Sequence, residues 1–118
     1  MAKKPGPWPF DFSTDADPQS LRGLSIPYVE WMRVRGFSEV TIHRRFNTLR
    51  IFFDWCELRS LTGPEDVTLP VLERYQKHLF HSLGVNGKKL SLRTQHVYLS
   101  ALRAYFAYLA REHPVLHN

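Results

Sequence analysis

The stretch SEVTIHRRFNTLRIFFDWC, residues 38–56, decides the fold class of this chain. Ser38 is a favourable helix N-cap, and Glu39 lies in the first turn, where a carboxylate interacts well with the positive end of the helix dipole. Apolar residues then recur at intervals of three and four, the period of a helix with one buried face. They are Ile42, Phe46, Leu49, Phe53 and Cys56, with Phe52 widening the stripe. The stretch therefore predicts an amphipathic helix to about residue 60, where Thr62-Gly63-Pro64 interrupts it.

Two further helices are predicted downstream. Thr68 as N-cap and Pro70 in the first turn indicate a helix that continues to about Leu83. Its expected inner face consists of Val71, Leu72, Tyr75, Leu79 and Phe80. After a turn at residues 84–87, Ser91 caps the longest helix, which runs to about Glu112. Its expected stripe consists of Leu92, Leu99, Leu102, Phe106 and Leu109, flanked by Tyr98, Tyr105 and Tyr108.

Upstream, a first helix is expected over about residues 21–35, ending at Gly36. Pro27 complicates its start, because proline inside a helix costs about 3 kcal/mol. Either the helix is kinked there, or it begins at Ser25 with Pro27 in its first turn, and the later start is favoured. None of these segments alternates with period two. The expected fold class is all-α, a compact bundle of four to five helices.

Composition narrows the functional classes. The 118 residues suffice for one domain, and 16 aromatic residues can supply its core. No apolar run is long enough to span a bilayer, and the first residues lack a secretion signal. The single cysteine, Cys56, cannot form an intramolecular disulfide, which fits a cytoplasmic protein. Residues 22–118 carry fourteen Lys and Arg against eight acids, a net of +6, which favours a partner with phosphates.

Residues 1–19 read as an extended, proline-rich arm with a slight acidic excess, ahead of a helical domain over residues 20–118. Trp8, Phe10 and Phe12 are unusual in such a segment. Either one of these rings packs into a groove on the domain, which is the favoured interpretation, or the arm docks on a partner.

The second and last helices share one design that suits duplex DNA. Each has a serine cap, a threonine three residues later, and then basic or amide side chains. A helix that enters the major groove uses such first-turn side chains to reach base edges, and its N-terminus favours phosphate. Lys88 and Lys89 precede the last helix, where a cation can meet a phosphate. The candidate DNA-binding residues are His43, Arg44, Asn47, Arg50, Lys88, Lys89, Arg93, Thr94, His96 and Val97. The alternative is that these side chains form an ordinary solvated face.

A family resemblance favours DNA. Gly36-Phe37-Ser38-Glu39-Val40-Thr41-Ile42, with the following stripe and Trp55-Cys56, resembles the second helix of the core-binding (SAM-like) domain of Xer-type and phage-integrase tyrosine recombinases. The segments at residues 90–94 and 99–106 are similar to that domain's last helix, and the resemblance covers about residues 20–118. It implies a C-shaped clamp whose second and last helices cross the major groove of double-stranded DNA.

The resemblance also implies a parent recombinase that acts as a tetramer on DNA, with its catalytic domain absent from this chain. By position it favours His43, Arg44, Asn47, Arg93, His96 and Val97 as groove-facing. Two positions depart from the family pattern, Arg45 and Gln95, and Gln95 is therefore expected to be partly buried rather than a reader of bases.

Catalytic chemistry is not expected in this chain. It has no His-x-x-Arg motif, and its five tyrosines lie in or beside apolar stripes. His78 and His81 lack a third metal-ligand partner, and no glycine-rich loop matches a phosphate-binding pattern. We expect no metal, cofactor, membrane or small-molecule substrate. The alternative function is a helical protein–protein interaction module, and a free-standing regulator would need a dimerisation element that the sequence does not show.

Overall fold

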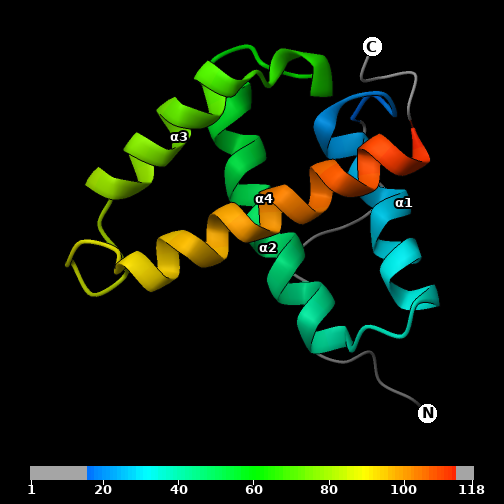
Figure 1. The fold of residues 1–118 in the computed structure, drawn as a ribbon, viewed down its shortest axis with the longest axis horizontal. Helices are drawn as coiled ribbons and strands as arrows, with labels where there is room; N and C mark the ends of the chain where they lie inside the picture. Colours follow the sequence, from blue (N-terminus) through cyan, green and yellow to red (C-terminus); the bar gives the residue numbers. More distant parts are fainter. Residues whose placement is uncertain (1–15, 114–118) are drawn as a thin grey trace.

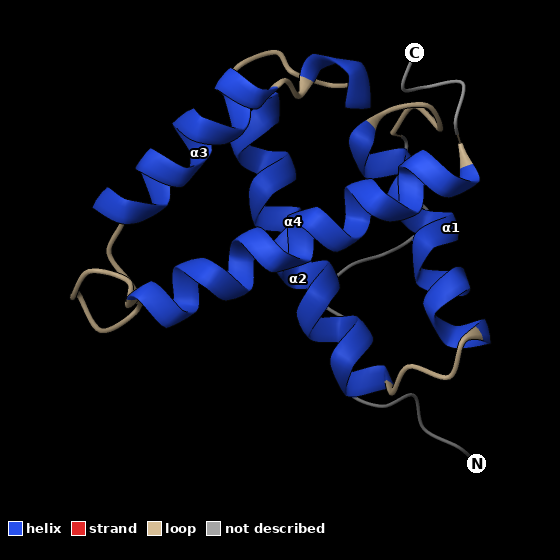
Figure 2. Ribbon diagram, viewed as in Figure 1, coloured by secondary structure: helices blue, strands red, loops and turns tan. Residues whose placement is uncertain are grey.

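Four α-helices cross one another in a computed structural model that describes residues 16–113. They are α1 (Leu21–Val34), α2 (Glu39–Glu57), α3 (Leu69–His81) and α4 (Leu92–Glu112), with a short 3-10 helix, η1 (Pro64–Asp66), between α2 and α3. Figure 2 shows helices joined by loops throughout this part of the chain. The expected all-α bundle is confirmed. Most of the proline-rich arm and the last five residues lie outside the described range.

The core joins all four helices through aromatic rings. Figure 1 shows α4 crossing α2, with α1 and α3 on opposite sides of the crossing. Four rings, each from a different helix, are at most 1% exposed: Tyr28, Phe52, Tyr75 and Tyr105. The centroids of Tyr28 and Tyr105 lie 5.0 Å apart, and those of Phe52 and Tyr75 lie 4.8 Å apart. None of the helices in the described range is long and apolar enough to cross a membrane.

The two serine caps form as expected and are alike. The hydroxyl oxygens of Ser38 and Ser91 accept from the backbone N–H groups of Thr41 and Thr94, both at 3.1 Å. Thr68 also occupies an N-cap position, but its side chain makes no capping hydrogen bond, so that part of the prediction is wrong.

The predicted late start of the first helix is also wrong, because α1 begins at Leu21 and contains Pro27. The Ser20 hydroxyl accepts from the Gly23 N–H at 3.0 Å, and Leu21 and Leu24 are buried. The Leu21 N–H donates to the Thr62 carbonyl at 2.7 Å. Capping and burial of the first turn therefore offset the cost of about 3 kcal/mol for an internal proline.

Two residues assigned to inner faces are exposed. Phe80 is 49% exposed and Leu92 is 75% exposed. Leu92 lies in the first turn of α4, which extends beyond the crossing with α2 in Figure 1, and the Phe80 ring lies 5.3 Å from the Lys89 ammonium. The helix ends differ as well. α2 ends at Glu57 rather than near residue 60, since Ser60 adopts a left-handed conformation with φ of 61°, and α3 ends at His81 rather than Leu83.

Replacing Gly23 with alanine should destabilise the protein by about 1–3 kcal/mol, although alanine is the better helix former by about 1 kcal/mol. A Cβ at this position would overlap the carbonyl oxygen of Asp17 and approach the Cα of Pro18 to 2.9 Å. Thermal unfolding followed by circular dichroism measures the effect. Gly84→Ala is the matched control, because its Cβ would meet no atom closer than 3.4 Å. A higher melting temperature for Gly23→Ala would contradict the packing described here.

Candidate nucleic-acid interface

A groove lies where the amino-terminal halves of α2 and α4 face each other, and it encloses about 310 Å³. It is lined by Thr41, Arg44, Arg45 and Thr48 of α2 and by His96, Val97, Ser100 and Ala101 of α4. On each helix these positions are separated by one, three or four residues, so each set forms a single face. The groove therefore joins the first turns of the two serine-capped helices in one surface.

The groove presents hydrogen-bond donors that the described part of the chain does not use. Arg44 and His96 are exposed, and within residues 16–113 their side chains make no hydrogen bond or salt bridge. Val97 adds an apolar surface that is 53% exposed. Arg93, likewise exposed and without an ion pair among the described residues, lies one turn before His96 and Val97 on the same face of α4. These groups remain available to a ligand.

Arg45 is the main lining residue that the candidate set omits. Its guanidinium lies 5.3 Å from the Phe37 ring, and its Nη1 donates to the Tyr28 hydroxyl at 3.4 Å. These two contacts hold the Arg45 guanidinium in place at the edge of the groove. The spacing of Thr41, Arg44, Arg45 and Thr48 repeats like that of the core stripe, and this second stripe is the signal that could have found it.

Three other predicted residues lie on the opposite flank of α2. Helical periodicity places His43, Asn47 and Arg50 together and turned away from the centre of the groove-lining set, although Asn47 lies only one turn from Arg44. The Arg50 Nη2 donates to the Asn47 Oδ1 at 2.7 Å, and the Arg50 Nη1 lies 3.9 Å from Asp54. Asn47 and Arg50 thus contribute to a polar network of the protein's own, and none of the three residues lines the groove.

That network continues to α1 through Arg22. Its guanidinium contacts Asp54 at 2.6 Å and Glu57 at 2.8 Å. The hydrogen bond to Glu57 raises the pKa of Arg22, against a smaller opposing effect of burial. The charges on this flank of α2 are therefore partly balanced within the fold.

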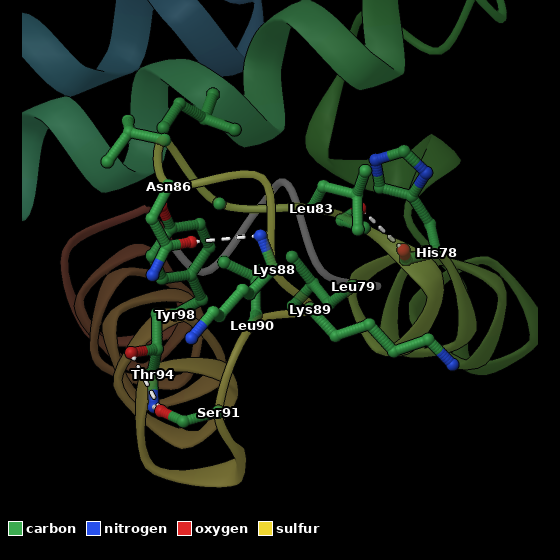
Figure 3. A pocket seen from close by; sticks show the side chains of 14 residues that line it. His78, Leu79, Leu83, Asn86, Lys88, Lys89, Leu90, Ser91, Thr94 and Tyr98 are labelled. Atoms are coloured by element: carbon green, nitrogen blue, oxygen red, sulfur yellow. Dashed lines mark hydrogen bonds between the residues drawn. The ribbon is translucent and has the colours of Figure 1, made fainter.

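Lys88, Lys89 and Thr94 line a second, larger pocket of about 600 Å³ between α3, the loop at residues 82–90 and the start of α4. Figure 3 shows the two lysine side chains diverging, with Lys89 extending along α3 and Lys88 on the α4 side. The Gly84 N–H donates to the Lys88 carbonyl at 2.7 Å, which folds the loop back on itself. The Lys88 side chain thus lies on the side of the amino-terminus of α4, and the Lys89 ammonium lies beside Phe80 of α3.

Gln95 is 8% exposed, and its Nε2 donates to the Leu90 carbonyl at 3.0 Å. The expectation that Gln95 is buried is therefore confirmed.

Four of the five tyrosines are buried, as expected; Tyr98 is partly buried. Burial raises the pKa of Tyr75 and Tyr105, which disfavours the phenolate. Burial likewise raises the pKa of Cys56 to about 12. Among residues 16–113 no three His, Cys, Asp or Glu side chains gather closely enough to hold a metal ion. Within residues 16–113, the exposed groups of the candidate interface therefore offer a ligand positive charge and hydrogen-bond donors.

Comparison with curated proteins shows which protein class the chain resembles. Over 91 residues the chain is 44% identical to a curated protein described as tyrosine recombinase XerC 2, from Ralstonia nicotianae. The match covers 77% of this chain and 26% of that protein, so the chain spans about a quarter of its relative's length. No family model matches the sequence, and no solved structure gives a significant match.

Proposed function

We propose that this chain, a domain related to tyrosine recombinases, binds duplex DNA and inserts the first turns of α2 and α4 into the major groove. The observation that carries the proposal is the groove in which Arg44 and His96, from two serine-capped helices, lie side by side without partners among the described residues. A major groove about 12 Å wide admits an α-helix, and arginine is the side chain that most often reads its guanine edges.

The other candidate residues contact either the bases or the backbone of the DNA, according to their position on α2 and α4. Arg93 lies on the same face of α4 and reaches the same major groove of the DNA. Val97 offers an apolar contact to a thymine methyl group. Lys88, Lys89 and Thr94, beside the α4 amino-terminus, contact a phosphate without reading sequence. His43, Asn47 and Arg50, on the far flank of α2, meet the sugar–phosphate backbone at the rim.

We further propose that the parent protein is a tyrosine recombinase in which this domain is the non-catalytic, core-binding half of a clamp. The catalytic half and the assembly on DNA, expected to be a tetramer, belong to the longer protein. The support is the 44% identity to a recombinase of which this chain covers only a quarter.

Fluorescence anisotropy with a labelled duplex of family-type inverted repeats tests the proposal. Binding should weaken as salt rises, with a log–log slope of about −0.9 for each phosphate neutralised. Arg44→Gln should weaken binding by about 1–3 kcal/mol if Arg44 contacts a base edge. Arg74→Gln on α3 is the matched control, because Arg74 is exposed and lines neither pocket described above. No binding at low salt would reject the proposal in favour of a protein–protein interaction module.

A further inference from the structure

An apolar groove lies on the other flank of α4, between this helix and α3, and encloses about 290 Å³. Its walls are Leu69, Leu72, Glu73 and Gln76 of α3 and Leu99, Leu102, Arg103 and Phe106 of α4. Leu69 lines the groove although it is 68% exposed. The lining is mostly apolar, and the exposed side chains of Glu73, Gln76 and Arg103 stand at its rim.

We propose that this groove is the docking site of the chain's own amino-terminal segment, through Trp8, Phe10 and Phe12. These aromatic residues occur at every second position. In an extended segment, alternate side chains lie on one side, so the three rings form a single apolar edge. Pro7 and Pro9 favour that extended conformation.

The start of α1, just after the segment, is hydrogen-bonded to α4, whose residues 99–106 form one wall of the groove. The Leu21 carbonyl accepts from the Tyr105 hydroxyl at 2.7 Å, and Tyr105 is adjacent to Phe106 in α4. The Leu21 N–H donates to Thr62, seven residues before Leu69. Phe12 and Trp8 lie four and eight positions before Ala16, so the chain between them and Ala16 spans at most about 13–29 Å.

Charge also fits. Residues 1–21 carry two lysines and three aspartates, a net of −1, against +6 for the rest of the chain. Asp11 lies between Phe10 and Phe12, and Arg103 at the rim makes no salt bridge within residues 16–113. The docked segment can therefore place a carboxylate beside this cation.

Docking here leaves the proposed DNA surface open. Leu102 and Phe106 lie on a different face of α4 from Val97 and Ala101, and Leu99 lies between the two faces. The segment therefore stabilises the α3–α4 contact without competing for the groove between α2 and α4.

A double-mutant cycle on the full 118-residue chain tests the docking. One arm replaces Trp8, Phe10 and Phe12 together by serine, and the other is Leu69→Ser, at an exposed position where the fold itself tolerates the change. In the wild-type background Leu69→Ser should lower the melting temperature by about 4–8 °C. In the three-serine background the same change should have almost no effect, because the contact is already lost.

Leu58→Ser is the control, since Leu58 is 85% exposed at the end of α2 and lies outside the groove. Its effect should be equal in both backgrounds. Additive effects of the three-serine and Leu69→Ser changes would overturn the proposal. The proposal would also be overturned if sedimentation equilibrium showed a dimer and the coupling between the two changes disappeared when that dimer was diluted. The segment in the groove would then belong to a second copy of the chain. Amide chemical-shift changes at residues 69–76 and 99–106 in the three-serine variant support docking, and changes confined to residues 16–24 reject it.

Discussion

Replacing Phe52 with alanine should lower the free energy of unfolding by about 3–5 kcal/mol, a large part of the stability of a domain this size. Phe52 is fully buried. Its ring centroid lies 4.8 Å from that of Tyr75 on α3 and 6.4 Å from that of Phe106 on α4. The substitution removes the contacts that join α2 to both helices and leaves a cavity that the surrounding rings cannot fill. Equilibrium unfolding in urea measures the loss.

Val40→Ala is the control for that experiment. Val40 lies in the first turn of the same helix but is 60% exposed, so its truncation should change stability by no more than about 0.5 kcal/mol. Equal losses for the two variants would show that Phe52 does not occupy the core as described.

The charge-reversed double variant Arg44→Glu/Arg93→Glu should bind duplex DNA about a hundredfold more weakly or worse. Each arginine that contacts a base edge contributes about 1–3 kcal/mol, and 1.4 kcal/mol corresponds to a tenfold change in affinity. Reversal also adds repulsion between the new carboxylates and the phosphates. Anisotropy titration at low salt measures the loss, and an unchanged melting temperature shows that the fold is intact.

The matched control is Arg74→Glu/Lys77→Glu, which changes the net charge by the same amount on α3. Both of its residues are exposed and line neither the α2–α4 groove nor the loop pocket. If the two double variants lose affinity equally, the total charge of the domain determines binding and the groove does not. If neither loses affinity, the interface lies elsewhere.

Much of the candidate site could be anticipated from local pattern. The serine caps and the threonine after each follow from residue type and spacing, because capping depends on neighbours within one turn, whereas the buried position of Gln95 was implied by the family resemblance. The grouping of the cations could not be anticipated. Arg44 and Asn47 are both polar residues on the outer side of α2, and only the position of α4 places Arg44 in a groove and leaves Asn47 beside Arg50.

The sequence by itself therefore determined the all-helical class, the serine caps of α2 and α4, most of the buried aromatic residues and the basic character of the domain. These properties depend on periodicity and composition, which can be read from the sequence without knowing how the helices pack. The tertiary structure alone decided that α1 begins at Leu21 despite Pro27, that Leu92 and Phe80 are exposed, and that Arg44 and His96 share one groove. Each of these depends on how two helices cross, because burial and proximity are set by residues far apart in sequence.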